Sequence, residues 1–324
     1  MRILKKFFAL IYIIIFISIV FLFTSCNSLG EEKIQKVGML VENSINDQTW
    51  GNKGYKGLLE IREEFDVDVY FKEEVKTEQE VDRAVQEFAN KGVNLIFGHS
   101  SIYGKMFDNI SKSYPDIHFV YANGGYSNDN LTSLNFSSHA MGFFGGMVAG
   151  EMTKTNKVAI IAAYEWQPEI EGFYEGVHFQ NPNAEVLMNF VNSWDNKERA
   201  LELYNQMNKK DADVFYPAGD AFSVSVINQV KSDGNYAIGF VTDQAELGGK
   251  TVLTSTVQHV DQLYLLAAKQ FNKGELKGGI FTYDFGDDVI TMGEFSEEVP
   301  KPFRKKLKES INEYIESGLL PNEK

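Results

Sequence analysis

Short strand-like runs alternate with longer helix-like segments along most of the chain, and this alternation constrains the fold more than any other feature. Runs of apolar residues predict strands at 34–41, 67–71, 93–98, 117–123, 131–136, 157–162, 184–190, 212–216, 235–241 and 251–257. Helical spacing of apolar residues predicts helices at 50–65, 77–92, 102–114, 139–152, 168–179, 197–209, 220–232, 259–273 and 300–317. This order predicts an α/β fold with parallel sheets that carry helices on both faces.

About ten strands with one crossover helix each exceed one ordinary doubly wound sheet, so we expect two doubly wound parallel-sheet lobes. The chain has 324 residues, which is enough for two such lobes. Thr77 and Glu80 form a capping-box pattern at the start of one helix. Gly146 and Gly150 on the helix at 139–152 predict close packing of that helix against a sheet.

The N-terminus has the pattern of a secretion signal. Arg2, Lys5 and Lys6 precede an apolar run at 7–23 that only Ser18 interrupts, and the single cysteine of the chain, Cys26, follows. "FTSC" resembles the lipobox of bacterial lipoproteins, except that Phe stands where Leu is usual. We expect a signal peptide at 1–25, lipidation of Cys26 and a tether at 26–33; the alternative is an uncleaved N-terminal anchor. Both place the body on the extracytoplasmic face of the cell membrane.

Charge and motif content argue against several classes of function. The formal net charge is −14, and an acidic surface repels phosphate backbones, so no direct binding of nucleic acid is expected. The five histidines lie far apart with no cysteine nearby, which argues against a metal site. No complete phosphate-binding loop, dinucleotide fingerprint or nucleophile elbow occurs, so we expect neither an enzyme nor a cofactor.

Polar and aromatic residues gather in loops that follow the predicted strands. In open α/β sheets, ligands bind outside the carboxyl ends of the strands, so these loops are the candidate binding site. Any one of these residues could instead serve as a cap, a turn or rim packing. The candidates are Asn46, Asp47, Trp50, Tyr103 and Asn123 from the first lobe, Trp166, Asp220, Phe222 and Asp243 from the second, and Gln258 near a crossing strand.

Four segments resemble motifs of the basic membrane protein (Bmp) family of solute-binding lipoproteins, which includes purine nucleoside receptors of ABC transporters. They are "NSINDQTWGNKGYKG", "MGFFGGMVAG", "GFVTDQ" and "VLTSTVQHVD". The resemblance implies a fold of the type I periplasmic-binding-protein kind, whose lobes close by hinge motion on a small polar, nucleoside-like ligand. It implies an ABC permease or a membrane signalling protein as partner. We expect lobe 1 at 34–138 plus about 255–290, and lobe 2 at 139–254 plus about 291–324.

This sequence departs from the family pattern at positions that matter for a nucleoside. Ile45 stands where the family has a stacking Phe, Val241 matches an Asp, and Gln258 with His259 match a Lys-Arg pair. Trp50 could supply the lost ring. Within the family, "WQPEIEGF" and "YPAGDAF" are similar to regulators of competence. The alternative function is therefore a positive regulator that raises comK expression indirectly, with weak or lost ligand binding.

Overall fold

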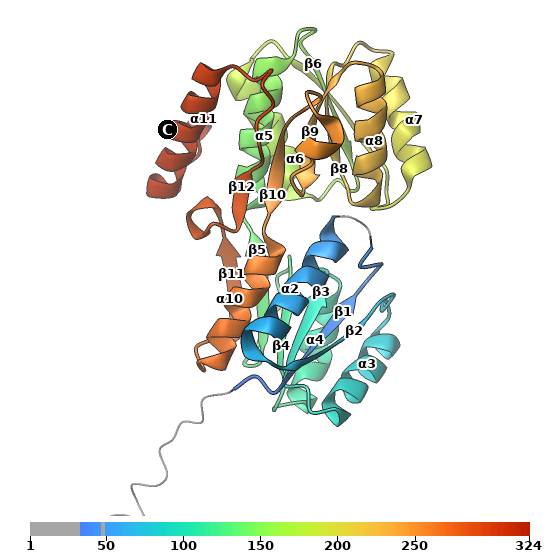
Figure 1. The fold of residues 1–324 in the computed structure, drawn as a ribbon, viewed down its shortest axis with the longest axis vertical. Coiled ribbons are helices and arrows are strands. Elements are labelled where there is room, and N and C mark those ends of the chain that lie inside the picture. The colour runs from blue at the N-terminus through green and yellow to red at the C-terminus, as the bar shows by residue number, and fades with distance from the viewer. Residues whose placement is uncertain (1–32, 47–48) are drawn as a thin grey trace, which may run out of the picture.

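The computed structural model describes residues 33–46 and 49–324, which fold into two α/β lobes stacked along the long axis of the molecule (Figure 1). Each lobe contains a six-stranded sheet. The predicted α/β class with two parallel-sheet lobes is confirmed. The signal peptide, Cys26 and the tether up to residue 32 lie outside the described residues.

The first sheet has the strand order β11-β5-β4-β3-β1-β2, and every neighbouring pair is parallel. One face packs on α2 and α10, and the other packs on α3 and α4. The strands are β1 (Lys36–Val41), β2 (Asp68–Lys72), β3 (Leu95–His99), β4 (His118–Ala122), β5 (Leu131–Phe136) and β11 (Gly279–Tyr283). The helices are α2 (Trp50–Phe65), α3 (Glu78–Asn90), α4 (Tyr103–Ile110) and α10 (Val260–Asn272).

The second sheet has the order β12-β10-β9-β8-β6-β7, and only β10 with β12 is antiparallel. Its strands are β6 (Lys157–Ala162), β7 (Glu185–Phe190), β8 (Val214–Ala218), β9 (Tyr236–Val241), β10 (Val252–Gln258) and β12 (Ile290–Met292). Its helices are α5 (Ser138–Met152), α6 (Pro168–Gln180), α7 (Lys197–Asn208), α8 (Ala221–Ser232), α9 (Ala245–Gly248) and α11 (Lys301–Ser317).

Strands β11 and β12 were absent from the sequence prediction. Each forms one edge of its sheet; β12 has three residues and β11 leaves three of its five residues exposed, so neither gives a clear apolar run. The chain passes between the lobes after β5, after β10 and between β11 and β12. The prediction placed the second passage at about 255; β10 pairs with β9 and β12 as far as Gln258, so the passage follows that residue.

The small residues of α5 have a different neighbour from the one predicted. A Cβ at Gly146 would lie against the carbonyl oxygen of Phe173, and one at Gly150 would lie 2.7 Å from that of Val177. Both carbonyls belong to α6. The expected helix–sheet contact at these glycines is thus wrong: they let two helix backbones approach closely. That contact fixes α6, whose first residues form part of the wall described below.

Helix ends follow local rules where the sequence offers them. Thr77 Oγ1 accepts a hydrogen bond from the Glu80 amide, and the Glu80 carboxylate accepts one from the Thr77 amide, which confirms the capping box. Among the described residues, none of the helices has the length and apolarity that a membrane crossing requires.

Candidate functional site

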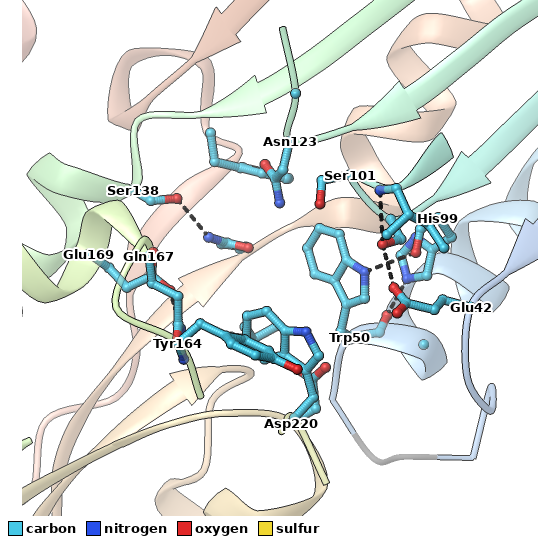
Figure 2. A pocket seen from close by; sticks show the side chains of 18 of the residues that line it. Glu42, Trp50, His99, Ser101, Asn123, Ser138, Tyr164, Gln167, Glu169 and Asp220 are labelled. Atoms are coloured by element: carbon cyan, nitrogen blue, oxygen red, sulfur yellow. Dashed lines mark hydrogen bonds between the residues drawn. The ribbon is translucent and has the colours of Figure 1, made fainter. Parts of the chain in front are cut away.

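A cavity of about 590 Å³ lies between the lobes, at the carboxyl ends of the strands of both sheets. This volume is in the range of sites for small organic ligands. Residues at or shortly after the ends of β1, β3, β4 and β5 line it from the first lobe, and residues at or shortly after the ends of β6, β7, β8 and β9 line it from the second. In Figure 2, Trp50, His99 and Glu42 lie on one side and Tyr164, Gln167 and Glu169 on the other.

Trp50 and His99 form a tightly bonded pair on the first wall. Their rings stack with centroids 4.7 Å apart and planes 12° from parallel. Trp50 Nε1 donates to the His99 carbonyl oxygen at 3.3 Å, and His99 Nε2 lies 2.7 Å from the Trp50 carbonyl oxygen. His99 is buried, and Phe136 packs edge-on against Trp50. The indole is therefore held in one orientation at the edge of the cavity.

Next to this pair, Ser100 donates its hydroxyl proton to the Glu42 carboxylate at 2.6 Å.

The backbone is unusual at one strand end on each wall. Asn123 and Val241 both line the cavity and have positive φ angles, 61° and 63°. A left-handed backbone is costly for a β-branched residue, and such strain concentrates where chains turn into binding sites. Thus a strand end on each wall turns sharply at the cavity.

The second wall presents aromatic rings and a buried carboxyl group. Tyr164 and Trp166 stack with centroids 5.4 Å apart, and Trp194 meets both edge-on. Gln167 accepts from the Tyr164 amide and donates to Glu169 Oε1, each at 2.8 Å. Burial raises the pKa of the Glu169 carboxyl, against the smaller opposite effect of the hydrogen bond from Gln167. Gln167 thereby holds the loop at Tyr164 and the carboxyl group of Glu169 in place.

A passage between the lobes forms part of the same site. Gln258 ends β10, lines the cavity and donates from Nε2 to Ser138 Oγ at 3.2 Å. Its carbonyl oxygen accepts a hydrogen bond of 2.8 Å from Lys53 on α2. Burial lowers the pKa of Lys53, and Asp261 opposes that shift. Two cavity-lining residues, Gln258 and Ser138, therefore lie at the passages after β10 and after β5, which are two of the segments about which the lobes would hinge.

Five of the ten ligand-site candidates line the cavity: Trp50, Asn123, Trp166, Asp220 and Gln258. Asp220 is 9% exposed, whereas Trp166 is 63% exposed and sits at the rim. The five come from both lobes, as expected if the loops after the strands converge. Asp47 lies outside the described residues.

Four candidates have other roles. Tyr103 is buried and donates to the Val75 carbonyl oxygen at 2.7 Å, and Phe222 is buried in the second lobe's core. Asp243 accepts the amides of Glu294 at 2.7 Å and Ala245 at 3.2 Å, which fixes the chain beyond β12. Asn46 is exposed and donates its amide to Ser44 Oγ. None of the four lines the cavity, because side chains near a strand end can turn into the core or along the surface.

Several cavity-lining residues were not among the candidates. His99 is the last residue of a buried strand, Glu169 lies in the first turn of α6, and Glu42 and Trp194 sit in loops with more obvious polar or aromatic neighbours. The sequence did offer an indication that His99 lies near the site, because it directly precedes the polar pair Ser100 and Ser101 at the end of a predicted strand. Its stacking on Trp50, 49 positions earlier in the chain, is visible only in three dimensions.

The lining is acidic and aromatic. Among the described lining residues there is no Lys or Arg, while Glu42, Glu169 and Asp220 supply carboxyl groups. Within the described ranges no cluster of three or more His, Cys, Asp or Glu residues is placed to hold a metal ion. The arrangement suits stacking on a planar ring and hydrogen bonding to donors of a small molecule that carries no negative charge.

Two similar lobes with a lined cavity between them at the carboxyl ends of both sheets define the fold of the type I periplasmic kind. The family model for PnrA-like ABC transporter substrate-binding proteins, Bmp, matches residues 34–324, and the chain belongs to this family. Family and fold are those of substrate-binding proteins rather than of enzymes.

Three known proteins show how similar the chain is to its relatives. The transcriptional activator protein med of Bacillus subtilis is 48% identical over 310 residues, which are 95% of this chain and 98% of that protein. A purine-binding protein of Brucella abortus is 25% identical over 296 residues, 90% of this chain and 83% of that one. The crystal structure of a transcriptional activator of the comK gene from Bacillus halodurans has a TM-score of 0.82 at 47% identity, covering 88% of this chain and 99% of that one.

Proposed function

We propose that this protein binds an uncharged, nucleoside-like small molecule between its lobes and delivers or senses it at the extracytoplasmic face of the cell membrane. The observation that carries the proposal is the lining: aromatic rings from both lobes, hydrogen-bonding groups, and no Lys or Arg among the described lining residues. A phosphate or carboxylate ligand would find no cation there, whereas a planar base with a sugar would find suitable partners.

Trp50 replaces the stacking ring that the family pattern places at Ile45. Ile45 is 8% exposed and belongs to the apolar core, so it cannot present a surface to a ligand. Trp50 lines the cavity, with His99 stacked on its ring and Phe136 packed edge-on, and we expect the part of the indole that borders the cavity to contact a base. Asp220 and the amides of Asn123 and Asn135 are the groups we expect to bond sugar hydroxyls or ring nitrogens. The purine-binding relative supports this ligand class.

Isothermal titration with inosine, guanosine and adenosine, each paired with its 5′-monophosphate, tests the ligand class. We expect at least one nucleoside to bind and its monophosphate to bind at least tenfold more weakly, because the added phosphate must be desolvated beside carboxylates. Absence of heat with all three nucleosides would count against the proposal, as would equal binding of the monophosphates.

A second candidate function is indirect activation of comK, favoured by the two activators that are 48% and 47% identical to this chain. An acidic, extracytoplasmic body would act through a membrane partner or a sensed ligand rather than on DNA. Expression of this chain in a Bacillus subtilis strain that lacks med, with a comK reporter, tests it. Restored reporter activity supports the regulatory role, and an unrestored reporter with normal protein levels opposes it.

The same strain can separate sensing from delivery. If the regulatory role depends on an occupied cavity, Trp50→Ala should fail to restore the reporter while the wild-type chain succeeds. If this protein serves an ABC permease, its deletion in the native host should reduce uptake of labelled nucleoside. Lipidation is tested by labelled palmitate and by Cys26→Ala, which should release the body from the membrane fraction.

A further inference from the structure

Behind the binding wall, Tyr264 makes a contact that spans 165 positions of the sequence. Its hydroxyl lies 2.7 Å from His99 Nδ1, and both side chains are buried. Tyr264 belongs to α10, directly after the second passage between the lobes, and its ring stacks on Phe97 with centroids 4.5 Å apart. It does not line the cavity.

The direction of the hydrogen bonds follows from the partners. His99 Nε2 faces the carbonyl oxygen of Trp50, which can only accept, so Nε2 must carry the proton. In a neutral ring Nδ1 is then the acceptor, and Tyr264 donates to it. Burial raises the pKa of Tyr264, which keeps its hydroxyl protonated and able to donate. The Trp50 carbonyl oxygen therefore fixes the tautomer of His99, and Tyr264 holds the ring in one orientation by donating to the Nδ1 acceptor of that tautomer.

The orientation of Trp50 depends in turn on His99. The indole stacks on the imidazole at 4.7 Å, and the two residues exchange a hydrogen bond in each direction between ring and main chain. A rotation of the imidazole would break the stack and the bond from Nε2 together. Because Trp50 lines the cavity, any loss of order at His99 reaches the ligand wall.

We propose that Tyr264 is a positioning residue of the binding site: its hydroxyl fixes the His99 ring and, through it, the Trp50 ring on which the ligand stacks. The effect on affinity rests on the proposed function, whereas the effect on His99 does not. The competing explanation is that the hydroxyl merely finds a partner for its own burial. The two differ in whether removing the hydroxyl changes His99 and Trp50 or only the stability of the fold.

Tyr264→Phe removes the hydroxyl and keeps the ring on Phe97. Tyr204→Phe is the matched control, because Tyr204 is equally buried and donates at 2.8 Å to Asp233 in the second lobe, away from the cavity. NMR of ¹⁵N-histidine-labelled protein, with His99 assigned by His99→Gln, reads the tautomer without ligand. We expect wild-type His99 to be protonated at Nε2, and Tyr264→Phe to move the Nδ1 resonance toward the value of an acceptor without a hydrogen bond. Tyr204→Phe should leave it in place.

Titration with inosine, guanosine and adenosine completes the test. Tyr264→Phe should weaken the tightest of the three by about three- to tenfold, the range for one lost hydrogen bond, and Tyr204→Phe by less than about twofold. Wild-type affinity in Tyr264→Phe, or an unchanged His99 spectrum, would overturn the proposal. If none of the nucleosides binds the wild-type protein, the proposed ligand class fails. The His99 spectrum alone then decides: a shifted Nδ1 resonance supports the positioning role and an unshifted one refutes it.

Discussion

Replacement of Gly54 by alanine should destabilise this protein, although a glycine-to-alanine change at an ordinary exposed helix position is stabilising. Gly54 lies on α2 and is buried against His99. A Cβ at this position would stand 2.6 Å from both nitrogens of the imidazole, well inside van der Waals contact. The ring cannot retreat easily, because Tyr264, the Trp50 carbonyl and the indole hold it on three sides.

The magnitude follows from two opposing effects. Alanine in place of glycine within a helix contributes about 0.5–1 kcal/mol of stability by reducing the freedom of the unfolded chain. Insertion of a methyl group into a filled core costs about 1–3 kcal/mol. Because Gly54 faces a ring with hydrogen bonds on both nitrogens, we expect the second effect to win, with a net loss of about 1–2 kcal/mol.

Urea denaturation followed by circular dichroism compares the wild type with Gly54→Ala. We expect a lower urea midpoint for the variant and an unchanged dependence of the unfolding free energy on urea concentration. The control is the same change in a His99→Ala background, where the clashing ring is gone. There Gly54→Ala should be neutral or stabilising, so the two backgrounds should differ in sign. A higher midpoint for Gly54→Ala in the wild-type background, or the same loss in both, would refute the reasoning about this contact.

Three further predictions concern the cavity and its surroundings. Trp50→Ala should weaken binding of the tightest nucleoside by about tenfold or more, while Trp50→Phe keeps part of it, as titration calorimetry would report. Glu169 has a raised pKa in the folded state, so it adds most stability below its unfolded pKa, and this contribution is lost as the pH rises through the folded pKa. Urea midpoints from pH 4.5 to 8 should therefore fall more steeply with pH for the wild type than for Glu169→Gln, and parallel curves would contradict this. Asp243→Asn should lower stability by about 1–3 kcal/mol through its bonds to Glu294 and Ser255 and leave nucleoside affinity unchanged, since Asp243 does not line the cavity; weaker binding without lower stability would reverse that assignment.

The fold was largely predictable because local patterns carry it. Apolar runs of five to seven residues became the buried strands, and the Thr77 capping box starts α3 where the pattern placed it. The prediction failed at β11 and β12, which are exposed or short edge strands stabilised by pairing with β5 and β10. Pairing with a distant strand leaves no apolar periodicity for a sequence pattern to detect.

The site was predictable in position but only partly in membership. Strand ends in a parallel sheet converge on one edge, so loops containing Trp50, Asn123 and Asp220 were expected to meet, and they do. Tyr103 and Phe222 follow strand ends as well, yet both turn into the core. Whether a side chain near a strand end faces a cavity or a core depends on the helix packed beside it, which local sequence does not encode.

The sequence by itself predicted the two-lobed parallel architecture and the sheet edge at which the candidate loops, including the one that carries Trp50, gather around the cavity. Both predictions depend on the periodicity of apolar residues and on the order of strands and helices, which can be read directly along the chain. Only the tertiary structure decided that His99 holds Trp50, that Tyr264 holds His99, and that Gly54 leaves space for the ring. These contacts join residues up to 165 positions apart, and their energies depend on distances of a few tenths of an ångström that arise when the two layers of the first lobe pack together.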